Sequence, residues 1–204
     1  MTRKKFSLLL YFSAIFIMGC SVSKDPLQTQ LKQLQKGIIK EDTSYAYRLP
    51  YAYNTSHCLV QGYFSHYSHK NRAALDFKMK RGTEVLAARE GVVIRIKEDG
   101  NKGGWNKKYR TDGNFVIIEH ADGSRAGYWH LQHNGALVNV GDSIIKGQLI
   151  AYSGKTGLAL FPHLHFFVWR FDKDGRWQQI GTRFKTSKGI VYLRPYRKYR
   201  NNNL

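Results

Sequence analysis

Two histidines separated by a single residue form the sequence feature best placed to do chemistry together. They are His163 and His165 in the segment Pro162-His163-Leu164-His165-Phe166. Residues two apart on a β-strand point to the same face, so the two imidazoles would share one face and Leu164 and Phe166 the other. Such a pair could supply a metal ligand and a neighbouring proton-transfer group, although packing is the commoner role of an isolated His-x-His pair.

Three further residues are candidates for the same chemistry. Asp76 lies between Leu75 and Phe77 in a stretch that we expect to be buried. A buried carboxylate needs a cation, a metal ion or several hydrogen bonds, and a structural ion pair would also satisfy it. His69 lies upstream of Asp76, and His130 stands among aromatic residues, where a lone histidine is usually packed in a core.

The candidate residues lie in a region of short runs of β-branched and aromatic residues. Asp-Gly pairs, which are typical of hairpin turns, separate these runs. The strands that we predict are residues 91–97, 115–120, 125–131, 148–152 and 163–170. No long helix and no alternation of strands with helices is expected in this region. The pattern therefore favours an antiparallel all-β domain.

The first twenty residues have the composition of an export signal. A basic start at Arg3, Lys4 and Lys5 precedes an apolar run over 6–18 that is too short to cross a bilayer comfortably. The run ends at Gly19-Cys20, which resembles the lipobox of bacterial lipoproteins, where cleavage leaves a lipidated cysteine at the new N-terminus. An uncleaved anchor helix is the alternative, and both readings export the chain and hold it at a membrane.

Residues 21–45 are predicted to be a partly helical tether to a domain over 46–182. Asp25-Pro26 is a plausible helix start. Apolar residues then recur at helical spacing, at Leu27, Leu31, Leu34 and Ile38. We expect this helix to act as a spacer or to pack on the domain.

An ordered set of short fragments between residues 47 and 169 resembles one family. In chain order it comprises Arg48-Leu49-Pro50, Ser68-His69, Ala74-Leu75-Asp76-Phe77, Gly91-Val92-Val93, Asn114-Phe115-Val116-Ile117-Ile118-Glu119-His120, Tyr128-Trp129-His130-Leu131, Val140-Gly141-Asp142, Lys146-Gly147-Gln148 and Pro162-His163-Leu164-His165-Phe166. The set is similar to the M23 family of zinc metallopeptidases, the lysostaphin-like or LytM-type endopeptidases of bacterial cell walls. The resemblance implies the family's all-β fold, an antiparallel sandwich or barrel-like hybrid domain of the duplicated hybrid motif type.

The resemblance also implies roles for five residues. His69, Asp76 and His165 would hold one Zn²⁺ per chain, and His130 and His163 would be the catalytic histidines. Three nitrogen or oxygen ligands leave a position open for water, which is the pattern of a catalytic zinc site. In many members of the family the first ligand histidine stands four residues before the ligand aspartate, and Arg72 takes that position here. A longer spacing between the two ligands also resembles the family and selects His69, with His66 as the fallback.

The function that the resemblance implies is zinc-dependent hydrolysis of peptide cross-links in peptidoglycan, with its peptide stems as substrate. The bond could join D-Ala to diaminopimelate or lie in a glycine bridge. The alternative is a metal-free LytM-like module that binds the cell wall or activates an amidase. No substrate-binding residue is assigned.

The charge of the chain is strongly positive, with 33 Lys and Arg against 14 Asp and Glu and a net charge of +19. Nucleic acid would suit that charge, but the export signal argues against it. The last 22 residues, 183–204, form a basic tail without acids that we expect to add affinity for anionic lipid or the acidic wall polymer. Ser21 after Cys20 is compatible with the periplasmic face of the outer membrane.

Overall fold

The computed structural model describes residues 26–36 and 45–202. The predicted signal segment 1–20, the lipidation site Cys20 and the predicted helix residue Ile38 lie outside the described residues. The helices are α1 (Pro26–Lys36) and the 3-10 helix η1 (Lys107–Asp112). The strands are β1 (Ala46–Tyr47), β2 (Ser56–Gln61), β3 (Ala74–Lys78), β4 (Glu84–Leu86), β5 (Gly91–Lys97), β6 (Gly103–Gly104), β7 (Phe115–Glu119), β8 (Arg125–Trp129), β9 (Leu131–Ala136), β10 (Ser143–Ile144), β11 (Leu149–Ser153), β12 (Gly157–Leu158), β13 (His163–Phe171), β14 (Trp177–Ile180), β15 (Arg183–Thr186), β16 (Gly189–Tyr192) and β17 (Arg197–Arg200).

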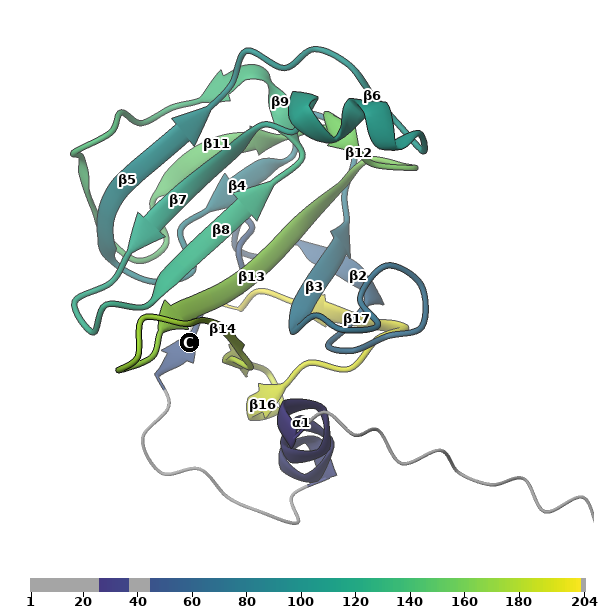
Figure 1. Ribbon diagram of the computed structural model, residues 1–204, viewed down its shortest axis with the longest axis vertical. Helices are drawn as coiled ribbons and strands as arrows, with labels where there is room; N and C mark the ends of the chain where they lie inside the picture. Colours follow the sequence, from purple (N-terminus) through teal and green to yellow (C-terminus); the bar gives the residue numbers. More distant parts are fainter. Residues whose placement is uncertain (1–25, 37–44, 203–204) are drawn as a thin grey trace, which may run out of the picture.

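A large antiparallel sheet organises the molecule (Figure 1). Its strands follow the order β10-β5-β7-β8-β13-β3-β2-β17, and β14 pairs with β13. A smaller sheet, β4-β11-β9, lies behind β5, β7 and β8 in Figure 1. The predicted antiparallel all-β fold is confirmed, with two short parallel pairs, β1 with β15 and β6 with β12, as local exceptions.

The alternation of residues along β13 separates a core face from a site face. Leu164, Phe166 and Val168 belong to the main hydrophobic core, where they meet residues of β3, β8 and β11. His163 and His165 occupy the alternate positions and face the other way, as the two-residue period requires. Each fully buried Leu or Phe side chain stabilises the fold by roughly 1.5–3 kcal/mol, so the core face holds the register that places the histidines.

Helix α1 packs on the domain through one apolar stripe. Leu31 is buried in a cluster with Phe64 and Tyr192, and it approaches Gly181 so closely that a Cβ there would lie 2.0 Å from a Leu31 methyl group. The amide of Gln35 adds a hydrogen bond to the carbonyl oxygen of Leu193 at 3.1 Å. The described segments contain no helix of the length and apolarity that crossing a membrane requires.

The C-terminal residues depart from the tail that we expected to begin at residue 183. Over 183–200 the chain forms β15 and β16, which pair with each other, and β17, which pairs with β2 at the edge of the large sheet. Phe184 is fully buried in the main core, and the Tyr51 hydroxyl donates to the carbonyl oxygen of Tyr199 at 2.9 Å. These residues are part of the domain, because apolar residues between the basic ones fill its core.

We predict that Phe184→Ala lowers the free energy of unfolding by about 3–5 kcal/mol, because it empties a fully buried aromatic position. Ile190→Ala is the matched control, since Ile190 lies in the neighbouring strand with 49% of its surface exposed and should cost less than about 1 kcal/mol. Urea unfolding of both variants measures the difference. Equal small losses would mean that residues 183–200 are not part of the cooperative fold.

Candidate functional site

The centre of the candidate site is a cross-strand pair on β3 and β13. Asp76 and His165 lie directly opposite each other in the ladder. His165 Nδ1 donates to Asp76 Oδ1 at 2.7 Å, and the two residues are 9% and 2% exposed. The sheet register alone therefore brings together two residues that are far apart in the sequence.

The loop between β2 and β3 adds a second imidazole. His69 Nε2 lies 3.3 Å from Asp76 Oδ1 and 3.3 Å from His165 Nδ1. Its Nδ1 donates to the carbonyl oxygen of Gly62 at 3.3 Å, so in the neutral ring Nε2 carries the lone pair that faces the cluster. One ligand atom from each of the three residues falls within 4.8 Å of the others. Two imidazole nitrogens and a carboxylate oxygen form a donor set that suits zinc.

A glutamine that the sequence did not single out completes the surroundings of Asp76. Gln61 Nε2 donates to Asp76 Oδ2 at 2.6 Å and to Ser68 Oγ at 2.9 Å, and its Oε1 accepts from the Ser68 backbone amide at 3.1 Å. Gln61 therefore ties the carboxylate to the residue preceding His69. A register shift between Leu59 and Gln61 sets this amide opposite Asp76.

These contacts determine the charge of the cluster. Burial opposes ionisation of Asp76, but the hydrogen bond from His165 and the nearby imidazoles outweigh it and hold the pKa of Asp76 well below its usual value. Burial lowers the pKa of His165, only partly offset by Asp76. The geometry is that of one ionised carboxylate between two imidazoles, which could hold a divalent cation.

The two remaining predicted histidines flank this cluster. The rings of His130 and His163 lie 4.7 Å apart between centroids, and His163 Nε2 lies 3.8 Å from Asp76 Oδ1. His130 Nδ1 donates to the carbonyl oxygen of Thr156 at 2.7 Å, and His163 Nδ1 donates to that of Phe161 at 2.8 Å. With Nδ1 so occupied, each neutral ring has its lone pair on Nε2.

The environment of His130 keeps its ring uncharged. Burial, with contributions from His163 and His165, lowers the pKa of His130 to about 3. His130 also has a left-handed backbone, with φ of 64°, at the turn from β8 to β9. The amide of Gly154 donates to its carbonyl oxygen at 2.9 Å, so the glycine-rich segment 154–157 forms a turn beside the site.

The other histidines stand apart from the cluster. His66, the fallback ligand, is exposed, and so is Arg72, which occupies the usual ligand position. His120 is buried with its Nδ1 donating to the carbonyl oxygen of Glu90 at 2.7 Å, and His57 packs on the ring of Tyr51. The geometry thus brings together all five predicted residues and leaves the fallback outside.

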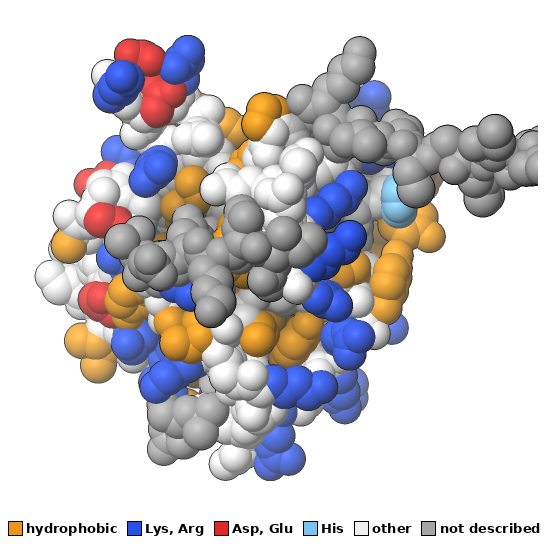
Figure 2. All heavy atoms as spheres, turned by 90° about the horizontal axis from the view of Figure 1, so that it is seen from below, with side chains coloured by type: hydrophobic (Ala, Val, Ile, Leu, Met, Phe, Trp, Pro, Cys, Tyr) orange, Lys and Arg blue, Asp and Glu red, His pale blue; other side chains and the backbone are white. Residues whose placement is uncertain are grey.

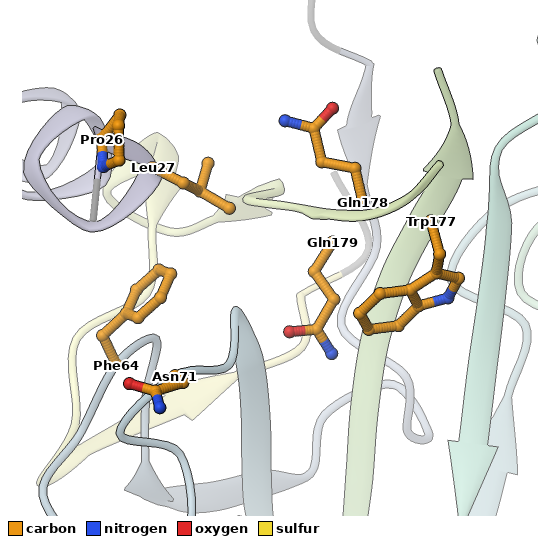
Figure 3. A pocket seen from close by; sticks show the side chains of 7 residues that line it. All are labelled: Pro26, Leu27, Phe64, Asn71, Trp177, Gln178 and Gln179. Carbon is orange, nitrogen blue, oxygen red and sulfur yellow. The ribbon is translucent and has the colours of Figure 1, made fainter. Parts of the chain in front are cut away.

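A separate pocket of about 310 Å³ lies between α1, β14 and the β2–β3 loop (Figure 3). Its lining consists of Pro26, Leu27, Phe64, Asn71 and residues 177–179. None of the five site residues lines it, so it is distinct from the histidine cluster.

Comparison with known proteins identifies the family. The sequence model of peptidase family M23 matches residues 67–179, which is more than half of the chain. The chain therefore belongs to peptidase family M23.

Two curated relatives and one solved structure illustrate the similarity. The chain is 33% identical over 100 residues to an uncharacterized metalloprotease of Buchnera aphidicola, covering 48% of this chain and 23% of the relative. It is 36% identical over 91 residues to the peptidoglycan DD-endopeptidase ShyA of Vibrio cholerae, covering 45% and 18%. The catalytic domain of lysostaphin from Staphylococcus simulans aligns with a TM-score of 0.43 and 29% identity, over 62% of this chain and 88% of that one. The chain thus spans about a fifth of the length of these curated relatives.

We predict that Gly157→Ala disturbs the turn over residues 154–157, which contacts His130. Gly157 has φ of +78°, and a Cβ there would lie 2.6 Å from Gly113 Cα and 3.5 Å from His130 Nδ1. Gly123, with φ of +75° and nothing within 4 Å of a Cβ, is the matched control for backbone strain alone. Gly123→Ala should cost about 1–2 kcal/mol of stability, and Gly157→Ala clearly more. Equal losses in urea unfolding would mean that the contact with Gly113 is not tight.

Proposed function

We propose that this chain is a zinc-dependent endopeptidase that hydrolyses peptide cross-links of bacterial peptidoglycan. The observation that carries the proposal is the convergence of His69, Asp76 and His165 within ligand distance, with His130 and His163 beside them. Membership of family M23 and the similarity to a peptidoglycan endopeptidase support the choice of substrate.

The donor set of the site fits a single zinc ion. His69, Asp76 and His165 would hold it, and three such ligands leave a position open, as in catalytic zinc sites. When bound, zinc would supply the positive charge that acidifies a water molecule and polarises a peptide carbonyl. Gln61 and the carbonyl of Gly62 form hydrogen bonds that orient the ligands Asp76 and His69. Loss of such a partner typically lowers metal affinity about 10–100-fold.

His130 and His163 would perform the proton transfers. Each ring is anchored through Nδ1 to a backbone carbonyl, so Nε2 is free to accept a proton from the attacking water. A ring that has accepted the proton becomes a donor, and it can then stabilise the developing oxyanion or protonate the leaving amine. The two rings divide these tasks between them.

The decisive experiment combines zinc analysis with digestion of purified sacculi. We expect about one zinc ion per chain and release of muropeptides that stops when a chelator is added. His163→Ala should keep the zinc and lower cleavage by about 10²–10⁴-fold, because it removes a proton-transfer group and no ligand. His69→Ala should lose most of the zinc, whereas His66→Ala, its exposed control, should keep both zinc and cleavage.

Other results would contradict particular parts of the proposal. A folded, metal-free protein that still binds sacculi would favour the alternative, a LytM-like binding or amidase-activating module. Full zinc content in His69→Ala would remove this residue from the ligand set. The released fragments would also show whether the cut bond joins D-Ala to diaminopimelate or lies in a glycine bridge.

We further propose that the chain is exported as a lipoprotein anchored through Cys20, at the periplasmic face of the outer membrane. The proposal rests on the basic start, the short apolar run and the Gly19-Cys20 junction. Mass spectrometry of the chain purified from membranes should find a mature N-terminus at Cys20 with an acyl modification. An unmodified N-terminal Met1 in the membrane fraction would contradict lipidation.

A further inference from the structure

A row of residues crosses four adjacent strands on the face that carries the histidine cluster. The ladder pairs His163 of β13 with Lys78 of β3, Lys78 with Cys58 of β2, and Cys58 with Lys198 of β17. Residues directly opposite each other in a sheet lie on the same face. The face that begins at a candidate catalytic histidine therefore continues through two lysines to the edge of the sheet.

Arg200 extends this basic surface along β17. It lies two residues after Lys198, on the same face, and pairs with Ser56. The side chains of Lys78, Lys198 and Arg200 are all exposed, whereas Asp76, two residues before Lys78, is buried. We call these three residues the basic row.

The strands that carry the basic row have no exposed acidic side chain. Strands β2 and β17 contain no acid, and the single acid of β3, Asp76, is engaged by His165 and Gln61. Within the described part of the chain, no member of the basic row forms an ion pair with a carboxylate. On the face seen in Figure 2, Asp and Glu side chains lie at the left, whereas Lys and Arg side chains occur on both sides and are most frequent at the right.

We propose that the basic row is an anion subsite that binds carboxylates of the peptide being cleaved, an inference that rests on the function proposed above. Adjacent strands are about 4.8 Å apart, so β3 and β17 lie roughly 5 and 14 Å from β13. An extended peptide advances about 3.4 Å per residue. A carboxylate one or two residues from the cut bond would reach Lys78, and one about four residues away would reach Lys198.

The position of the basic row favours a peptide over an anionic lipid surface. The row is continuous with His163, so a planar membrane pressed against it would also cover the histidine cluster. A peptide that enters the cluster, in contrast, passes over Lys78 when it runs towards β17. The occupant is therefore an acidic peptide, and binding to lipid becomes an outcome of the test.

The test uses the full chain and three synthetic peptide substrates that differ only in carrying Glu, Gln or Lys near the cut bond. We expect the Glu peptide to have the lowest KM, with kcat similar for the Glu and Gln peptides. Lys78→Gln and Lys198→Gln should each raise the KM for the Glu peptide about threefold and leave the Gln peptide unchanged. Lys78→Glu should reverse the preference towards the Lys peptide, and added salt should reduce all of these differences.

Lys173→Gln is the matched control, because it removes one positive charge from the exposed turn beyond the far end of β13. It should leave the preference for the Glu peptide intact. Equal KM values for the Glu and Gln peptides in the unaltered protein would overturn the subsite. So would a result in which the Lys→Gln variants lose binding to phosphatidylglycerol vesicles but keep the preference for the Glu peptide.

A binding measurement separates failure of the subsite from failure of the proposed function. Fluorescently labelled Glu and Gln peptides are titrated into His163→Ala, in which cleavage is expected to be at least about 100-fold slower. Tighter binding of the Glu peptide, lost in His163→Ala/Lys78→Gln/Lys198→Gln, supports the subsite even if no peptide is cleaved by the unaltered protein. Equal binding of the two peptides overturns it, whatever the protein hydrolyses.

Discussion

The burial of one carboxylate constrains the rest of this structure. Asp76 is 2% exposed, and an ionised carboxylate removed from water costs several kcal/mol unless its oxygens are satisfied. Its partners come from three places: His165 across the ladder, Gln61 from β2 and His69 from the loop between β2 and β3. A slip of one residue on β3 would turn Asp76 into the core and Phe77 out of it, so the carboxylate and the core enforce the same register.

The two faces of the large sheet have different roles, because one face packs in the main core and the other carries the candidate site residues. On β13 the core face is filled by Leu164 and Phe166, which are fully buried, while His163 and His165 alternate with them. The histidines are thus carried by a strand whose position is held from the opposite side. His130 is the exception, because it sits on a turn with a left-handed backbone and depends on the 154–157 segment for support. The position of His130 is therefore not set by the pairing of strands.

The sequence predicted those parts of the molecule that depend on local pattern. The two-residue period of a strand predicted which residues of β13 share a face. The position of Asp76 between Leu75 and Phe77 indicated a buried carboxylate that needs partners. The grouping of His69 with Asp76 and His165 came from the family resemblance, since no local pattern joins residues so far apart. Gln61 could not be predicted, because its role depends on a register shift in β2. The C-terminal strands were missed because dense basic residues obscured Phe184 and Leu193, which are fully buried.

The position of β17 has a consequence for the order in which the large sheet is assembled. Until β17 arrives, β2 is an edge strand with unpaired backbone groups, and it carries Gln61, the partner of Asp76. The residues joined by the Tyr51–Tyr199 hydrogen bond are 148 apart in sequence, so this closure is among the most non-local in the fold. A chain that emerges N-terminus first completes its large sheet only when residues 197–200 appear. The backbone edge of β2, the strand that carries Gln61, therefore stays unpaired until β17 has been synthesised and has docked on it.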